Sequence, residues 1–443
     1  MGPSAAAMSL ARRLDLRLDP DPSRVLLRTF LPSLVVRPTG ADAASQPRLE
    51  DLVQRVAALD QATVEALLEQ VRGRFATRHR DQAERVGLHA GALPARGPAA
   101  LAAGRLDPAR RSLLGCYLTS EYALEAAALF NPSVVPHPDQ QGLADGELRF
   151  VLSLRATGEG HISSITFRSG VISADGQVRL EPVSPFVQEG VITPAASAGD
   201  YTVTYRPDTG ISERLLFPVT GPESNGLEDA RFVAFDDDAG QRHWYATATA
   251  YDGQGVSSRL ISTDDFRCFQ VGSLRGRAVV NKGLALFPRR LGGSCWMLGR
   301  QDGRSLSLMR SDRLDHWDEA TPLLEPCFPW EFIQVGNCGS PLETEAGWLV
   351  LTHGVGPMRQ YAIGAALLDR HDPQRLLGRL RQPLLVPSEE ERDGYVPNVV
   401  YSCGALIHHG QLLLPYAVSD RASRFALVPL EPLLEELLAS PPP

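Results

Sequence analysis

Three tryptophans recur at a constant interval, and this repeat constrains the fold more than any other feature of the sequence. Trp244, Trp296 and Trp348 are each 52 residues apart, and each begins a short apolar run. Similar runs begin at Leu148 and Leu412, which gives five related segments. Short strands repeated with a period of about 50 residues are typical of a β-propeller, whose radially arranged blades leave only short sheet edges exposed.

The expected architecture is therefore all-β: a five-bladed β-propeller with an N-terminal α-helical extension. The propeller is expected over residues 131–430, after an N-terminal helical region with a linker over residues 1–130. A short C-terminal helix and tail are predicted over residues 431–443. A β-sandwich or a β-barrel, with a chance spacing of the tryptophans, is the alternative.

The N-terminal region is predicted to be helical because its apolar residues recur at intervals of three and four. This spacing runs through residues 49–90. A second helix is predicted over residues 108–129, ended by Asn131 and Pro132, because the residue before a proline disfavours the helical conformation. The segment 91–104 between them, rich in Gly, Ala and Pro, is predicted as a linker.

The composition is that of a globular chain. It has 443 residues, of which 43% are hydrophobic and 22% charged, so it can bury a large core. No apolar run reaches the roughly 18 to 20 residues of a membrane-spanning helix. Charged residues interrupt the first twenty positions, so no secretory signal is expected. The six cysteines are scattered without a CxxC pair, which argues against a zinc site and for a cytoplasmic protein.

The charge distribution argues against a nucleic-acid partner. The formal net charge is −8 and there is no basic tract. Of the 44 basic residues, Lys282 is the only lysine, which leaves 43 arginines. In a chain so biased toward arginine, this single lysine is a candidate functional residue.

A site at the hub of a propeller would draw polar groups from every blade. The polar residues on or beside the five runs are Arg155, Tyr251, Arg300, His353 and Tyr416. Each also has a structural interpretation, as a salt-bridge partner or as a polar residue satisfied within the core.

The loop SNGLEDARF at residues 224–232 carries a more specific signal. Glu228 and Asp229 are adjacent carboxylates, whose side chains point to opposite faces of an extended segment. One can face a cleft while the other braces the scaffold through Arg231. A carboxyl group that acts as general acid is what glycosidic bond cleavage requires. Alternatively, these residues form a structural turn in which the carboxylates pair with the arginine and have no catalytic role.

Basic groups on successive predicted blades indicate an anion site. Lys282, Arg300 and His353 offer a compact charge, a planar fork of donors and a tunable donor. There is no Walker-type phosphate loop, so inorganic phosphate is expected rather than a nucleotide. The pair His408 and His409 is interpreted as a solvated turn, and no metal site is predicted.

With these motifs in order, residues 131–430 resemble glycoside hydrolase family 130. The family consists mainly of β-mannoside phosphorylases, with some β-1,2-mannosidases, on a five-bladed β-propeller. The motifs that carry the resemblance are NPSV at 131–134, GLEDAR at 226–231, NK at 281–282, LFP at 286–288, ETEAGW at 343–348, HGV at 353–355, GAALLD at 364–369 and VPNVV at 396–400.

The resemblance implies a role for each of these positions. Asp229 would be the general acid, with the proton passing through the 3-hydroxyl of the mannosyl unit. The sugar would be held by Arg155, Glu228 and Asn131, and the phosphate by Lys282, Arg300, His353 and Tyr361. Phosphate would attack the anomeric carbon in one inverting step and give α-mannose 1-phosphate. The resemblance implies no cofactor, with inorganic phosphate as the co-substrate.

Two positions depart from the family pattern. Gly283 replaces the aspartate that usually follows the lysine, and Gly299 replaces the histidine that phosphorylases commonly carry before Arg300. Both affect the expected geometry of phosphate binding.

Two other functions stay open. One is an inverting β-mannosidase in which Glu213, Glu223 or Glu228 activates water. The other is a non-catalytic sugar-binding propeller. The expected partners are manno-oligosaccharides with β-1,2 or β-1,4 linkages and phosphate, with no nucleic acid and no membrane. The N-terminal helical region is expected either to shape acceptor choice or to mediate homo-oligomerisation.

Overall fold

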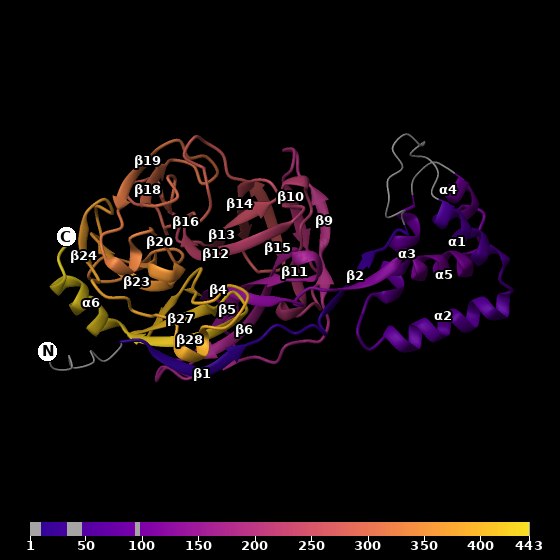
Figure 1. The fold of residues 1–443 in the computed structure, drawn as a ribbon, viewed down its shortest axis with the longest axis horizontal. Helices are drawn as coiled ribbons and strands as arrows, with labels where there is room; N and C mark the ends of the chain where they lie inside the picture. The colour runs from indigo at the N-terminus through magenta and orange to yellow at the C-terminus, as the bar shows by residue number, and fades with distance from the viewer. Residues whose placement is uncertain (1–9, 33–46, 94–97, 443) are drawn as a thin grey trace. The chain divides into compact units, whose positions relative to one another are not determined.

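The chain forms two compact units in the computed structural model, which describes residues 10–32, 47–93 and 98–442 (Figure 1). We call the first the helical unit; it comprises the described parts of residues 22–124, together with 185–187. We call the second the sheet unit. It comprises the described residues before 22, residues 125–184 and the described residues from 188 onward.

The helical unit combines helices with one antiparallel strand pair. Its described elements are α1 (Pro47–Ala58), α2 (Gln61–Phe75), α3 (Gln82–Gly91), α4 (Pro98–Ala103), α5 (Pro108–Tyr117), β2 (Val25–Thr29) and β3 (Thr119–Ala123). Leu49, Val53 and Leu114 are fully buried in its core. The side chains of Asp60 and Asp107 accept hydrogen bonds from backbone N–H groups in the first turns of α2 and α5, which satisfies donors that a helix start leaves unpaired.

The predicted helix over 108–129 is wrong beyond Tyr117. The chain continues as β3, and Asn131 and Pro132 lie inside strand β4 (Ala128–Pro136) instead of ending a helix. The apolar residues Tyr122 and Leu124 are two positions apart, which matches the two-residue period of a strand. They also fit the apolar face of a helix. Over so short a segment, periodicity alone does not separate the two.

Two further expectations for the N-terminal region are corrected. The predicted linker 91–104 contains helix α4, since the alanine-rich sequence PAALAA favours a helix; residues 94–97 of it lie outside the described residues. The region is also not wholly helical. Strand β1 (Arg12–Leu18) pairs with β28 (Ala422–Pro429), so the first described segment of the chain joins the last sheet.

The sheet unit contains five successive sets of antiparallel strands. In the order in which the strands pair, each of the five predicted apolar runs forms the second strand of its set. These strands are β5 (Leu148–Thr157), β13 (Arg242–Tyr251), β17 (Cys295–Gly299), β22 (Trp348–Val355) and β27 (Gln411–Val418). The sequence repeat therefore marks one equivalent strand in every set.

The remaining strands complete these sets. The first set adds β4, β6 (Ser163–Ile172) and β7 (Val178–Leu180), and the second adds β12 (Gly226–Asp236), β14 (Val256–Thr263) and β15 (Cys268–Ser273). The third adds β16 (Ala285–Leu286), β18 (Leu306–Ser311) and β19 (Ala320–Leu324). The fourth adds β20 (Gln334–Asn337), β21 (Leu342–Glu343), β23 (Tyr361–Leu368) and β24 (Leu376–Arg379). The fifth adds β25 (Val400–Tyr401), β26 (Leu406–His408), β28 and β1.

Four short strands lie between the first two sets in sequence. They are β8 (Gln188–Glu189), β9 (Val191–Pro194), β10 (Tyr201–Thr204) and β11 (Arg214–Leu216). Strands β9 and β10 extend the second set beyond β15, while β8 and β11 attach to β6. A parallel pairing of Gly226 with Ser163 joins the first two sets into one sheet.

The repeated tryptophans are structural. Trp244, Trp296 and Trp348 are all buried, and each indole nitrogen donates a hydrogen bond to a backbone carbonyl oxygen at 2.9–3.2 Å. Each therefore contributes a large apolar surface to the core while its polar atom is satisfied. The predicted C-terminal helix is confirmed as α6 (Leu430–Ala439), which buries Leu433 and Leu437.

Among the described residues, no helix combines the length and the apolar character that a membrane span requires.

Candidate functional site

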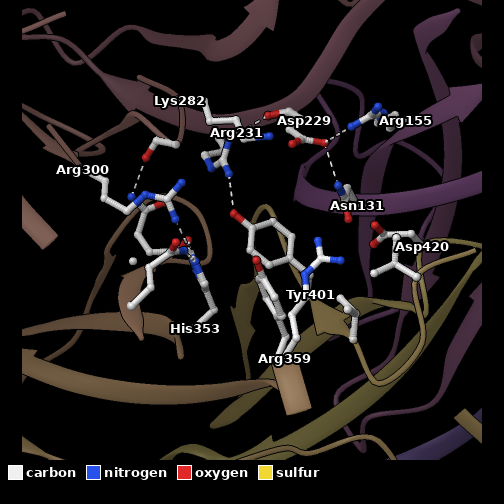
Figure 2. Close-up of a pocket in the computed structure, with 17 residues that line it drawn as sticks. Asn131, Arg155, Asp229, Arg231, Lys282, Arg300, His353, Arg359, Tyr401 and Asp420 are labelled. Atoms are coloured by element: carbon white, nitrogen blue, oxygen red, sulfur yellow. Dashed lines mark hydrogen bonds and ion pairs between the residues drawn. The ribbon is translucent and has the colours of Figure 1, made fainter. Parts of the chain in front are cut away.

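The predicted site residues converge on one cavity of the sheet unit. It has a volume of about 310 Å³, and all five sets contribute to its lining (Figure 2). Asn131 comes from β4, Asp229 from β12 and Lys282 from the segment before β16. His353 comes from β22 and Asp420 from the turn between β27 and β28. The whole unit, and not one local motif, assembles the site.

Several residues that line the cavity share an uncommon backbone conformation. Asn131, Asp229, Arg359 and Asp420 have φ angles of 49°, 52°, 56° and 50°, a region that non-glycine residues rarely occupy. The strand pairing shifts register at Asn131 in β4 and at Asp229 in β12, so both residues lie at β-bulges. A bulge redirects side chains out of the regular alternation of a strand, and strained backbone of this kind clusters at functional sites.

Asp229 is a buried carboxylate with two polar contacts. Its Oδ1 atom accepts a hydrogen bond from Nδ2 of Asn131 at 2.6 Å and lies 3.4 Å from Nη1 of Arg155. Nη2 of Arg155 donates to Oε1 of Glu228 at 2.7 Å. The guanidinium therefore bridges the two adjacent carboxylates, which holds both in fixed positions.

The expectation that Arg231 braces one of these carboxylates is wrong. Its Nη1 donates to the backbone carbonyl oxygen of Asp229 at 3.0 Å, and its Nη2 donates to the hydroxyl of Tyr401 at 2.6 Å. Arg231 thus supports the bulged backbone that carries the acid and links it to strand β25.

Burial and neighbouring charges set different pKa values for the carboxyl groups. Burial would raise the pKa of Asp229, but the positive charges of Arg155 and Lys282 outweigh it and lower this pKa to about 2. Burial and the charge of Asp229 raise the pKa of Asp420 to about 6. Burial also raises the pKa of Glu228. At neutral pH the unliganded cavity therefore holds Asp229 as a carboxylate.

The predicted basic residues lie in the same cavity. Lys282, Arg300 and His353 all line it. Figure 2 shows Arg300 and His353 on the opposite side of the cavity from Asn131. The rings of Tyr361 and Tyr401 pack against His353, with centroid distances of 6.0 Å and 4.9 Å.

The structure corrects the charge expected of His353. Its Nδ1 lies 3.1 Å from the carbonyl oxygen of Asn337, which can only accept, so Nδ1 carries the proton. Nε2 lies 3.0 Å from the side-chain amide of Gln334 and 3.3 Å from Nη1 of Arg300. Burial, reinforced by the charge of Arg300, lowers the pKa of His353 to about 3. Of the basic trio expected from the sequence, Lys282 and Arg300 are cations, and the lowered pKa of His353 favours its neutral form.

Seven of the eight residues to which the family resemblance gave a role line this cavity. They are Asn131, Arg155, Asp229, Lys282, Arg300, His353 and Tyr361. The eighth, Glu228, lines a second cavity of about 260 Å³, which shares Arg155 and Asp420 with the first. Tyr251 lines the second cavity as well, together with His161 and Tyr395, whose ring centroids are 5.7 Å apart. The two cavities therefore adjoin each other at Arg155.

One candidate lies elsewhere, and three charged or phenolic side chains of the lining were missed. Tyr416 is fully buried and donates to Oε1 of Glu391 at 2.7 Å, so it belongs to the core. The missed residues are Arg359, Tyr401 and Asp420. A signal existed for Asp420, because it follows the fifth apolar run as Arg300 follows the third. Arg359 and Tyr401 lie in a turn and in a two-residue strand, for which the repeat gives no position.

The described residues contain no group of three or more His, Cys, Asp or Glu side chains arranged to hold a metal ion. Nε2 of His408 instead lies 2.8 Å from the carbonyl oxygen of Gly146.

A buried carboxyl group beside a cluster of basic side chains in one cavity can supply acid catalysis and hold an anion, as cleavage of a glycoside by phosphate requires. The chain belongs to glycoside hydrolase family 130. The model of this family, described as β-1,4-mannooligosaccharide phosphorylase, matches residues 209–438, all within the sheet unit.

Two curated relatives have similar sequences. The 1,2-β-oligomannan phosphorylase of Thermoanaerobacter sp. (strain X514) is 31% identical over 223 residues, which are 48% of this chain and 71% of that protein. The β-1,2-mannobiose phosphorylase of Listeria innocua serovar 6a is 30% identical over 236 residues, which are 50% of this chain and 63% of that protein.

A solved structure shares the fold. The Listeria innocua β-1,2-mannobiose phosphorylase in complex with β-1,2-mannobiose superposes with a TM-score of 0.52 at 20% sequence identity. The superposition covers 71% of this chain and 93% of that chain.

Proposed function

We propose that this chain is an inverting glycoside phosphorylase that cleaves β-1,2- or β-1,4-linked mannosides with inorganic phosphate and releases α-mannose 1-phosphate. One observation carries the proposal: a buried acid, Asp229, and an excess of basic side chains line the same cavity. An inverting phosphorolysis needs a proton donor for the leaving oxygen and a cationic site that brings an anion to the anomeric carbon.

In this proposal the sugar is held between the two cavities. Asn131, Arg155 and Glu228 bind the mannosyl ring, and Asp420 accepts from one of its hydroxyl groups. Asp229 delivers its proton through the 3-hydroxyl of the mannosyl unit. The second cavity, with its aromatic rings, receives the acceptor sugar.

The proposed phosphate site is formed by Lys282, Arg300 and Tyr361, with His353 acting through Arg300. A phosphate anion placed beside Lys282 offsets the charge that keeps the pKa of Asp229 low. Phosphate binding therefore favours the protonated, acid form of Asp229 in the ternary complex. The same positioned cations lower the cost of bringing an anion to a carbon with oxocarbenium character.

The hydrolase alternative requires a carboxylate that activates water, and the candidates named from the sequence do not line the main cavity. Oε1 of Glu223 lies 2.9 Å from Nε of the buried Arg259. Glu213 accepts a hydrogen bond from Ser184 at 2.7 Å. Glu228 is engaged by Arg155. These contacts favour phosphorolysis over hydrolysis.

We also propose that the five antiparallel sets are the blades of a five-bladed β-propeller. The sets follow one another along the chain, and β1 pairs with β28 in the fifth set, so the two ends of the sheet unit close into one blade. Side chains from all five sets line one cavity, as a common hub requires. A crystal structure with the five sets around one axis would establish this architecture.

The reaction as proposed needs no cofactor, since phosphate itself is the second substrate. We propose a cytoplasmic location, which the six free cysteines and the need for inorganic phosphate support. Homo-oligomerisation stays a prediction, which size-exclusion chromatography with light scattering tests directly.

Product analysis tests the function. The purified chain is incubated with β-1,2- and β-1,4-mannobiose, each with and without phosphate. We expect α-mannose 1-phosphate and mannose in equal amounts from one linkage, and only in the presence of phosphate. Free mannose formed at the same rate without phosphate would identify a hydrolase. No turnover of either disaccharide, with mannobiose binding retained, would identify a binding protein.

A further inference from the structure

Two basic side chains of the main cavity differ from the others in their contacts. Arg155 pairs with carboxylates and Arg300 with His353, while Arg231 donates to Tyr401. Within the part of the chain that the structure describes, the side chains of Lys282 and Arg359 form no hydrogen bond or ion pair, although both line the cavity. Both side chains are exposed, and their donors line the open cavity without a hydrogen-bond partner.

The charge balance of the cavity matches a doubly charged anion. Its described lining includes five basic side chains: Arg155, Arg231, Lys282, Arg300 and Arg359. Against them stand the carboxylates of Asp229 and Asp420, and Glu228, which pairs with Arg155 from the adjoining cavity. Two positive charges stay uncompensated, and the two side chains without partners can supply both.

The backbone that carries Arg359 is strained in a way that directs its side chain. Met358 and Arg359 both have left-handed φ angles, 57° and 56°, in the connection between β22 and β23. Backbone hydrogen bonds from Gly356 to Gln360 at 3.0 Å and from Gln360 to Pro357 at 3.2 Å close this turn. A non-glycine residue in this region costs about 1–3 kcal/mol, which persists only where the surroundings hold it in place.

Neighbouring residues of the same turn point in different directions. Met358 is 89% exposed and does not line the cavity. Arg359 is also exposed, but it lines the cavity, where Figure 2 shows its guanidinium on the side of Asp420. Tyr361, two residues later, lines the cavity as well. The turn thus delivers one cation to the cavity and leaves its other long side chain in solvent.

We propose that Arg359 is an additional anion-binding residue, which acts with Lys282 to bind a phosphate dianion, either free or as the phosphate group of α-mannose 1-phosphate. This inference rests on the proposed function. Lys282 offers a compact charge from the third set of strands and Arg359 a planar fork of donors from the fourth, so the two hold the anion from different elements.

The test compares three variants of the full chain with the wild type. Arg359→Gln removes the charge, Arg359→Lys keeps it, and Met358→Ala is the matched control in the same turn. The readouts are phosphate binding by calorimetry and the separate KM values for phosphate and for mannobiose. We expect Arg359→Gln to weaken phosphate about 10- to 100-fold, as loss of a charge-assisted hydrogen bond implies. Its KM for mannobiose should change less than about twofold.

The controls separate the possible causes. Arg359→Lys should recover most of the phosphate affinity, and Met358→Ala should bind phosphate as the wild type does. Circular dichroism and thermal unfolding establish that each variant is folded. If Met358→Ala weakens phosphate as much as Arg359→Gln, the geometry of the turn and not the charge matters, and the inference is overturned.

Failure of the inference and failure of the proposed function have different signatures. If the wild type binds phosphate and forms mannose 1-phosphate while Arg359→Gln binds phosphate equally well, only the role of Arg359 is refuted. If Arg359→Gln weakens phosphate and mannobiose to the same extent, Arg359 is not specific for the anion and the inference is again refuted. If the wild type neither binds phosphate nor uses it, both proposals fall.

Discussion

Nε2 of His353 lies 3.3 Å from Nη1 of Arg300, and the other ring nitrogen, Nδ1, lies 3.1 Å from the carbonyl oxygen of Asn337. Because burial and the charge of Arg300 lower the pKa of the imidazole, its neutral form can accept a hydrogen bond from the guanidinium through Nε2. This contact joins β22 of the fourth set to the end of β17 in the third. The contact suggests that His353, which was expected to bind phosphate, positions the guanidinium of Arg300.

The first prediction concerns pH. Because the pKa of His353 is lowered to about 3, its ring does not titrate between pH 5 and 8. The KM for phosphate, expressed per ionic form of phosphate, should show no break in this range that comes from His353, and a break near pH 6 is expected only from Asp420. His353→Phe should raise that KM about tenfold, the effect of one lost hydrogen bond to a charged group, and leave the shape of the profile unchanged. A break near pH 6.5 that disappears in His353→Phe would show instead that the ring carries a charge.

The second prediction concerns the acid. Asp229→Asn should reduce kcat about 10²- to 10⁴-fold, the range typical of a general acid, with the fold intact. The lowered pKa of Asp229 also means that its carboxylate stabilises the fold above the ordinary pKa of aspartate, and that this is lost as the pH falls toward 2. The variant should therefore be less stable than the wild type at pH 7, by about 2 kcal/mol. Thermal unfolding and initial rates measure the two effects, and near wild-type turnover would remove Asp229 from the acid role.

Asp420 should behave in the opposite way. Burial and Asp229 raise its pKa to about 6, so the folded state holds the proton more tightly than the unfolded chain does. The charged form destabilises the fold above pH 6, and this cost fades as the pH falls toward 4. Asp420→Asn should raise the unfolding temperature at pH 8 and leave it nearly unchanged at pH 4. The KM for mannobiose should rise, because Asp420 is proposed to accept a hydrogen bond from the sugar. Equal stabilisation at both pH values would contradict this electrostatic explanation.

Much of this site could be predicted because short motifs carry it. Glu228 and Asp229 are adjacent in a distinctive motif, which the structure places in strand β12. Lys282 is the only lysine of the chain, so both signals stood out before any fold was known. The constant spacing of the tryptophans located a corresponding strand in three sets, and all three indoles are buried.

The rest depended on backbone conformation and register, which residue types do not reveal. Asp420 and Arg359 reach the cavity from turns with left-handed residues, and no glycine marks either position. The protonation of His353 follows from a carbonyl group 16 residues away in the chain. The helix predicted beyond Tyr117 failed because the apolar residues that follow suit a strand equally well.

The fourth prediction separates the two substrates at Lys282. Its exposed side chain lines the cavity without a hydrogen-bond partner in the described structure, so Lys282→Ala removes an anion contact and breaks no hydrogen bond. The substitution also removes one of the charges that lower the pKa of Asp229. The KM for phosphate should rise about 10- to 100-fold. Binding of mannobiose without phosphate, measured by calorimetry, should change less than about threefold. Lys282→Arg is the charge-conserving control, and an unchanged KM for phosphate in Lys282→Ala would exclude this residue from the anion site.

The last prediction concerns the acceptor. Tyr395 is 71% exposed, and its ring lies 5.7 Å from that of His161 at the second cavity, so its loss should not affect folding. In the synthetic direction, with α-mannose 1-phosphate as donor, Tyr395→Ala should raise the KM for the acceptor sugar several-fold, because a sugar face loses its apolar contact. The KM for α-mannose 1-phosphate should stay constant. Tyr395→Phe keeps the ring and should behave as the wild type; an effect of Tyr395→Ala on the donor alone would place the acceptor elsewhere.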